Sequence, residues 1–178
     1  MKLHDFDDSI EHGKAGEAVV AKWLEHFPGV ERYEDVSDNP AFQEKDIDGI
    51  VWIKGNRYTT AEIKTDSYTS GNFFYETHSC VETNTIGCME RTDATHLYYY
   101  FTEYKEIYVL NMEEYRKWAL AEHAAHPDIL KDKRLQNKSK NKKRVHHSAG
   151  FIIPIAYLKE HFPKTFWSVY DMSAWQAA

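Results

Sequence analysis

The chain has 178 residues, of which 42% are hydrophobic and 15% aromatic, so it can form one domain with one core and does not resemble a disordered chain. Its net charge of -6 argues against a uniformly basic nucleic-acid-binding domain. No apolar run approaches the roughly 18 residues that span a bilayer, the N-terminus lacks the apolar stretch of a signal peptide, and two cysteines are too few for a disulfide scaffold, so we expect a cytoplasmic protein.

Helices are expected in three places, where apolar residues recur at helical spacing or a capping residue precedes them. Asp8 or Ser9 is expected to cap the first helix. Asn111, followed three residues later by Glu114 as in a capping box, is expected to cap the second. The three helices are expected to run from Ile10 to Phe27, from Asn111 to about Ala125 and from Ala156 to His161.

Strands are expected where β-branched and aromatic residues lie between turn signals. Gly55-Asn56 is the turn that joins two of them into a hairpin. Segment 79–93 has no clean period and is expected to be loop with one helical turn. No repeat or linker divides the chain, so we expect a single α+β domain over residues 1–178. The expected strands lie at 30–36, 47–53, 58–64, 72–77, 95–101, 106–110 and 150–155.

One stretch of chain reverses part of the charge argument. Between Lys131 and Arg144 there are eight Lys or Arg residues and one Asp, so the rest of the chain is clearly acidic. An acidic body with one basic segment fits a protein that holds cations with carboxylates and contacts phosphates with a cationic strip. A solvated loop explains the same composition equally well. Segment 131–147 is expected to be mobile when free, and its candidate nucleic-acid contacts are Lys138, Lys140, Lys142, Lys143 and Arg144.

The segment 45–52 and the tetrapeptide Ala61-Glu62-Ile63-Lys64 are the most informative part of the sequence. Because strand side chains alternate, Glu62 and Lys64 lie on one face and Ile63 on the other. Two charges that flank a residue expected to be buried need an explanation. For an isolated Glu-x-Lys, an exposed edge strand is the simpler explanation by roughly ten to one, so the neighbouring residues decide.

Hydrolysis of a phosphodiester needs a hard cation held by oxygen ligands and a group that positions the attacking water. Asp48 and Glu62, on adjacent strands, could share such a cation, and the backbone carbonyl of Ile63 could add a third oxygen. Lys64 could orient the water or neutralise charge that develops on the phosphate. The sequence therefore predicts a site for Mg²⁺, with Mn²⁺ as a substitute, around one tight turn.

Glu17 on the first helix is the fourth candidate. Val20 and Leu24 follow it at i+3 and i+7, so Glu17 borders an apolar stripe. Gly13 and Gly16 each cost the helix about 1 kcal/mol relative to Ala, which suggests close approach to a backbone or a ligand. A Glu at the helix rim beside flexible glycines is the alternative, and the hairpin motif favours a functional Glu17 by about two to one.

Two acidic residues compete for the metal-ligand position before the hairpin. Asp48 directly precedes the apolar strand and is favoured by about three to one over Asp46. A two-residue turn at Gly55-Asn56 would place Asp48 opposite Ile63, on the wrong face. Asp48 joins the Glu-x-Lys face only if the loop has an odd number of residues or a bulge shifts the register, and we expect that shift.

The candidate residues follow a fixed order: Glu on the first helix, Asp at the start of a strand, and Glu-x-Lys on the next strand. This order resembles the PD-(D/E)XK nuclease superfamily, and the resemblance covers residues 9–101. In this chain no Pro precedes the Asp. Segments 69–76 and 87–96 look like the strands that follow the motif in phage-type members. The resemblance implies a restriction-endonuclease-like core, a mixed β-sheet flanked by helices. It also implies that Asp48 and Glu62 bind Mg²⁺, that Glu17 joins them and that Lys64 assists the water.

The expected function is that of a Mg²⁺-dependent deoxyribonuclease, an endonuclease of phage or mobile-element type. Its expected partner is DNA, and no association with a membrane is expected. Two alternatives stay open: a DNA-binding module of the same fold without turnover, and an RNA-directed nuclease. The intact set of four site residues argues against lost turnover, because buried charges without a role would destabilise the fold. A homodimer would suit the cutting of two strands.

Overall fold

The computed structural model of the protein describes residues 4–138 and 145–175, and the side chains of residues 13–136 and 145–175. The described residues form two compact units, each assembled from separate stretches of chain. One unit takes residues up to 12 together with 70–91 and 114–163, and the other takes 13–69, 92–113 and 164 onwards. The prediction of a single domain stays a prediction, whereas the α+β class is confirmed.

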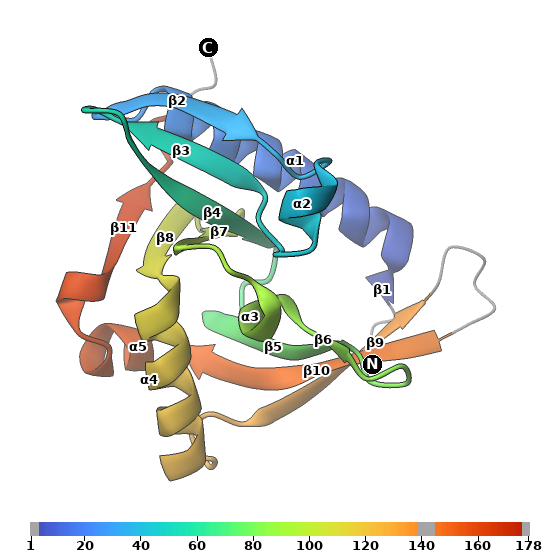
Figure 1. The fold of residues 1–178 in the computed structure, drawn as a ribbon. Coiled ribbons are helices and arrows are strands. Elements are labelled where there is room, and N and C mark those ends of the chain that lie inside the picture. The colour runs from blue at the N-terminus through green and yellow to red at the C-terminus, as the bar shows by residue number, and fades with distance from the viewer. Residues whose placement is uncertain (1–3, 139–144, 176–178) are drawn as a thin grey trace. The chain divides into compact units, whose positions relative to one another are not determined.

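The unit that contains residues 13–69 is built on a six-stranded mixed sheet (Figure 1). Its strands are rich in aromatic and β-branched residues, which suit a pleated and half-buried surface. Only β4 and β7 run parallel, and the other neighbouring strands are antiparallel. In sheet order the strands are β11 (Trp167–Asp171), β8 (Glu106–Asn111), β7 (His96–Phe101), β4 (Arg57–Asp66), β3 (Gly49–Ile53) and β2 (Val30–Asp35).

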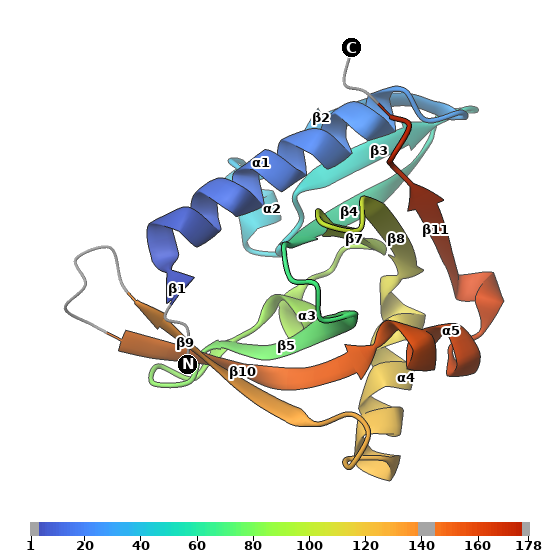
Figure 2. The same ribbon diagram turned by 180° about the vertical axis from the view of Figure 1, so that it is seen from behind.

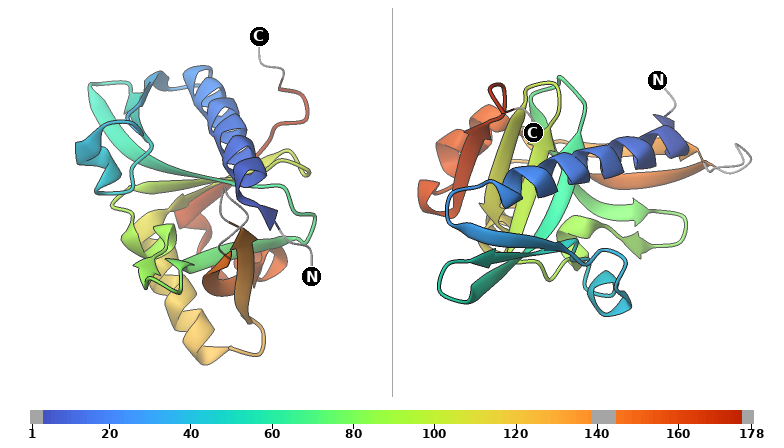
Figure 3. Two further views of the ribbon diagram at one scale, coloured as in Figure 1. Left: turned by 90° about the vertical axis from the view of Figure 1, so that its right-hand side faces the viewer. Right: turned by 90° about the horizontal axis from the view of Figure 1, so that it is seen from above.

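Helix α1 (Phe6–Glu25) covers one face of this sheet from Gly13 onwards, as Figures 2 and 3 show. The short helix α2 (Pro40–Gln43) lies between β2 and β3. α1 and the strands share a core in which apolar side chains exclude water. Its members include Val20, Trp23 and Leu24 from the helix and Val51, Ala61 and Ile63 from β3 and β4.

The other unit is built on a five-stranded sheet in the order β1 (His4–Asp5), β9 (Asp132–Lys138), β10 (Val145–Pro154), β5 (Asn72–Cys80) and β6 (Thr85–Ile86). Its helices are α3 (Cys88–Arg91), α4 (Met112–Ala125) and α5 (Ile155–His161). The ring of Tyr115 on α4 packs against those of Phe73 and Tyr75 on β5, so aromatic contacts join helix and sheet.

The expected strands and helices are present, with several boundaries shifted and further elements added. α1 begins at Phe6, so neither Asp8 nor Ser9 caps it. The added elements are α2, β6, β9 and β11, besides the two-residue β1 and the one-turn helix η1 (Lys164–Phe166). β9 lies in the basic segment 131–147, for which the sequence predicts a mobile segment, and it pairs antiparallel with β10, which begins at Val145 instead of the predicted Gly150.

The proposed phosphate contacts of the basic segment cannot be placed. Lys140, Lys142, Lys143 and Arg144 lie outside the described residues, and Lys138 is described only as the last backbone position of β9. Their role in nucleic-acid binding stays a prediction. No helix within the described part of the chain has the length and apolar character to cross a membrane.

Candidate active site

The β3–β4 hairpin sets the register on which the candidate site depends. Ile53 pairs with Arg57, so the loop has three residues, and the ladder ends with the pair of Gly49 and Ala61. Two loop residues, Gly55 and Asn56, have positive φ angles of 87° and 56°, a conformation that Gly and Asn adopt most easily. Beyond the pair of Gly49 and Ala61, the Asp48 N–H bonds to the Ala61 carbonyl, so Asp48 does not continue the ladder one step further to Glu62. The three loop residues confirm the predicted odd-numbered loop.

Asp48 is fixed at the point where β3 and β4 separate. Its backbone N–H donates to the Ala61 carbonyl at 2.9 Å, and its Oδ2 accepts from the Ile63 N–H at 2.7 Å. The N–H and C=O of one strand residue point to the same side of the strand. The Ile63 carbonyl therefore also faces the Asp48 side, as a ligand to a shared cation would require.

The neighbourhood of Asp48 is strongly acidic. Burial, opposed by the hydrogen bond from the Ile63 N–H and aided by the charges of Glu17, Asp46 and Asp35, raises the pKa of Asp48 to about 6. Burial and then Asp35 also raise the pKa of Glu17, whereas Lys14 lowers it. Several carboxylates that repel one another in this way form an environment that a cation would stabilise.

A hollow of about 240 Å³ brings Glu17 and Asp48 together. A second hollow, of about 660 Å³, lies beside the end of β2 and shares two acidic lining residues with the first. Oxygen atoms dominate the polar lining, which is the donor type that Mg²⁺ and Mn²⁺ prefer. The first hollow is lined by Lys14, Glu17, Ala18, Ala21, Tyr33, Asp35, Ser37, Asp38 and Asp48.

Glu62 and Lys64 do not line that hollow. Ile63 belongs to the core under α1, so by strand alternation Glu62 and Lys64 leave β4 on the opposite face. Glu62 is buried, with 6% of its surface exposed, and Lys64 is half-buried beside Asp66, whose pKa it lowers. The structure thus joins Asp48 to Glu17 through the hollow and to the backbone of Ile63, the residue after Glu62, through a hydrogen bond, but it does not bring the Glu62 and Lys64 side chains into the hollow.

No three His, Cys, Asp or Glu side chains within the described ranges are arranged as a group that could hold a metal ion. The observation that fits a cation is therefore electrostatic. Asp48 carries a raised pKa because it is buried among other carboxylates, and a bound divalent ion would offset that repulsion.

Asp46, the competing acidic residue, does not continue the strand. Its φ of 52° places it in the left-handed region, and its carbonyl accepts a hydrogen bond from the Thr92 hydroxyl at 2.6 Å. The segment before Asp48 is therefore bent, and Asp46 and Asp48 do not share a face by simple alternation. Asp48 as the ligand stays a prediction, and the hydrogen bond to Ile63 favours it.

Sequence reasoning missed Asp35 and Tyr33 on β2. Both lie on the face of β2 towards α1, and Tyr33 packs against the core there. A Cβ on Gly49 would overlap the end of the Tyr33 ring, so a larger residue at this position would have to displace that ring. The signal in the sequence was the alternation of Tyr33 and Asp35 in a strand interpreted only as half-polar.

The two glycines of α1 have different surroundings. A Cβ on Gly16 would lie 2.1 Å from the Thr65 hydroxyl of β4, whereas a Cβ on Gly13 would meet nothing closer than 3.9 Å. The predicted close approach is thus confirmed for Gly16 and does not occur at Gly13. The contact brings α1 close to β4 at the residue before Glu17, which lines the hollow beside Asp48.

We expect Gly16→Ala to lower the free energy of unfolding by about 1–3 kcal/mol, because the added methyl overlaps Thr65. The matched control Gly13→Ala should raise it by up to about 1 kcal/mol, since Ala is the better helix former and the space is open. Urea unfolding of both variants measures the difference. Equal effects of the two substitutions would contradict the close approach.

We also expect a pH effect on stability. The folded-state pKa of Asp48, about 6, lies above its ordinary value of 3.8, so the folded protein binds more protons than the unfolded chain between these values. Ionisation of the buried Asp48 therefore lowers the free energy of unfolding. This loss is absent below about pH 4 and complete above about pH 6, where it amounts to at most about 3 kcal/mol. Asp48→Asn removes this loss.

The measurement is urea unfolding in EDTA from pH 4 to 8. The stability gain of Asp48→Asn over the wild type should be small at pH 4 and largest above pH 6. Two stability curves that stay parallel over this range would show that Asp48 titrates normally.

Comparisons with protein-family models, with curated proteins and with solved structures gave no match.

Proposed function

We propose that this protein is a Mg²⁺-dependent nuclease that hydrolyses phosphodiester bonds in DNA. The observation that carries the proposal is the hydrogen bond from the Ile63 N–H to Asp48 across an odd-numbered hairpin loop. It ties Asp48, whose pKa is raised, to the backbone of the residue that follows Glu62. A restriction-endonuclease-like core and an endonuclease of phage or mobile-element type belong to the same proposal.

Each site residue has a proposed task. Asp48, Glu62 and the Ile63 carbonyl would hold the cation, and Glu17 would add a carboxylate from the hollow. When bound, Mg²⁺ would polarise the phosphate and supply positive charge. Lys64 would orient the attacking water and stabilise the charge that builds on the phosphate oxygens. Burial of Glu62 keeps its carboxylate in a low-dielectric setting, where such charge interactions are stronger.

The test is a cleavage assay on plasmid, linear, single-stranded and branched DNA. We expect cleavage with Mg²⁺ or Mn²⁺, none in EDTA, and binding with little turnover in Ca²⁺, which takes more ligands in looser geometry. Robust cleavage in EDTA would overturn the metal mechanism. Binding without cleavage in any metal would select a DNA-binding module, and cleavage of RNA alone would select an RNA-directed nuclease.

The partners follow from the same proposal. DNA is the proposed substrate, and a homodimer would place two sites on two strands. The oligomeric state in the presence of a short duplex, measured by light scattering, tests the second point separately.

A further inference from the structure

Three side chains form a row across β2, β3 and β4 near the closed end of the hairpin. Arg32 pairs in register with Trp52, and Trp52 pairs with Tyr58, so all three lie on one face of the sheet. The rings of Trp52 and Tyr58 lie 5.2 Å apart, and the Arg32 guanidinium lies 4.5 Å from the centre of the Trp52 ring. We call these three residues the aromatic row.

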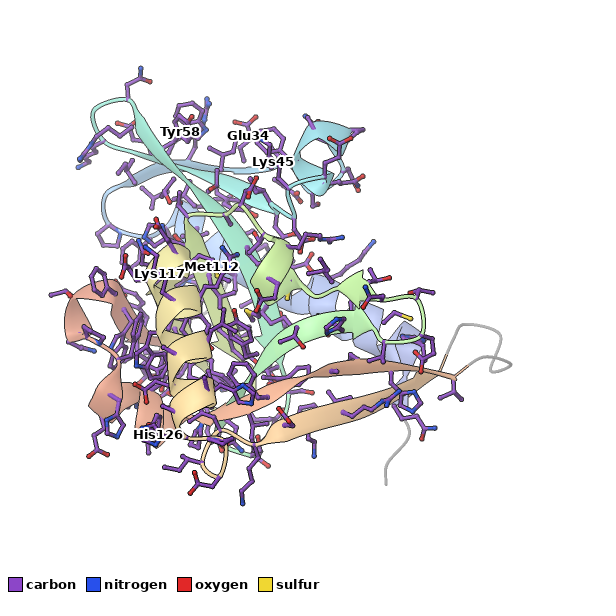
Figure 4. All side chains as sticks on the ribbon, turned by 60° about the horizontal axis from the view of Figure 1, so that its bottom comes forward. Glu34, Lys45, Tyr58, Met112, Lys117 and His126 are labelled. Carbon is purple, nitrogen blue, oxygen red and sulfur yellow. The ribbon has the colours of Figure 1, made fainter. Side chains whose placement is uncertain are left out.

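The aromatic row is preorganised and open to solvent. The Glu34 carboxylate accepts from the Trp52 ring N–H at 3.1 Å and from Arg32 at 3.4 Å, which holds both side chains in place. Among the side chains that the structure describes, Tyr58 is the most exposed large hydrophobic residue, at 62%. Figure 4 shows where Tyr58 and Glu34 lie on these strands. An exposed aromatic ring beside a fixed cation is the kind of surface on which nucleic-acid bases stack.

The aromatic row shares its face of β4 with Glu62 and Lys64, the two site residues that do not line the hollow. Tyr58, Glu62 and Lys64 are separated by even numbers of residues, so their side chains leave β4 on the same side. Tyr58 and Glu62 are four steps apart along the strand, which is about 13 Å. That distance corresponds to up to about four stacked nucleotides at 3.4 Å each.

We propose that Tyr58, supported by Trp52 and Arg32, stacks an unpaired base of the DNA strand whose phosphate lies at Glu62. The inference rests on the proposed function and adds a substrate class: DNA with a single-stranded segment beside the scissile bond. Paired bases present only their edges, so a flat ring can stack on a base only where the strand is unpaired. Exposed Lys54 and Arg57 at the hairpin end supply positive charge for the neighbouring phosphates.

The aromatic row could also serve only to stabilise the hairpin. Cross-strand aromatic pairs stabilise hairpins by about 0.2–1 kcal/mol, and the row would do so without any ligand. This account predicts lower stability on truncation of Tyr58 and no change in DNA binding. The two accounts therefore separate when binding is measured apart from stability.

The experiment measures binding of a fluorescently labelled thymidine oligomer by anisotropy in EDTA, where no cleavage is expected. We expect Tyr58→Ala and Tyr58→Thr to bind about 5- to 150-fold more weakly, which is the range for loss of one base stack. Tyr58→Phe keeps the ring and should bind like the wild type. The control Tyr104→Ala removes another exposed Tyr, on the β7–β8 turn of the same sheet, and should leave binding of the oligomer unchanged.

An oligomer of abasic sugar-phosphates supplies a second comparison that needs no variant. It keeps the charge and loses the bases, so the wild type should bind it more weakly than thymidine, and Tyr58→Ala should bind the two oligomers alike. Unchanged binding by Tyr58→Ala, or equal wild-type binding of the two oligomers, would overturn the inference. Because binding is read in EDTA, either result is independent of whether the protein cleaves DNA with Mg²⁺.

Discussion

Glu62→Gln and Asp48→Asn will each lower the rate of DNA cleavage by about 10³-fold or more, and each protein will still fold. Both substitutions keep the size of the side chain and remove its negative charge. Asn at position 48 can still accept the hydrogen bond from the Ile63 N–H, so the hairpin geometry survives. What is lost is the anionic ligand on which the proposed mechanism depends.

Stability separates this explanation from simple unfolding. The Asp48 carboxylate is buried among other acidic groups, so Asp48→Asn should keep or raise the melting temperature in EDTA at pH 7. Asp38→Asn, on the exposed rim of the same hollow, is the matched control and should keep full activity. An inactive Asp46→Asn beside an active Asp48→Asn would show that the wrong acidic residue was chosen.

The hairpin shows how far sequence reasoning reaches. The turn residues Gly55-Asn56 located the loop, and the chemistry of Asp48 and Glu62 required an odd number of loop residues. The pairing of Ile53 with Arg57 bears this out. Local sequence alone allowed a two-residue turn as well, so it was the functional requirement that selected the register.

Other features depended on tertiary contacts that periodicity does not encode. Asp35 enters the acidic hollow because β2 pairs with β3, and that pairing brings it opposite Gly49. β9 forms within a charged stretch because it has β10 as an antiparallel partner, which supplies the backbone hydrogen bonds that its composition does not predict. Gly16 was located correctly, but its contact with Thr65 required the fold.

Lys64→Ala will lower the cleavage rate by about 10²-fold or more while metal binding is retained. Lys64 lies two residues beyond Glu62 on the same face of β4, which suits a cation that acts on the phosphate rather than on the metal ligands. Lys64 is proposed to stabilise charge that develops only in the transition state. Its removal should therefore lower the rate at saturating DNA. Calorimetry of Mn²⁺ binding beside a single-turnover assay separates the two effects, and Lys64→Arg should recover part of the rate.

The alternative role for Lys64 is as a partner of Asp66. Burial raises the pKa of Asp66, and the Tyr68 N–H, the Tyr99 hydroxyl and Lys64 all lower it. The Tyr99 hydroxyl donates to Asp66 at 2.8 Å.

If Lys64 served only this carboxylate, Asp66→Asn would lose as much activity as Lys64→Ala. We expect instead that Asp66→Asn changes stability and keeps most of the rate, and that Lys64→Ala raises the pKa of Asp66 while cleavage is lost. A Lys64→Ala protein that still cuts DNA at the wild-type rate would exclude Lys64 from the chemistry and leave Glu62 and Asp48 without a water-positioning group.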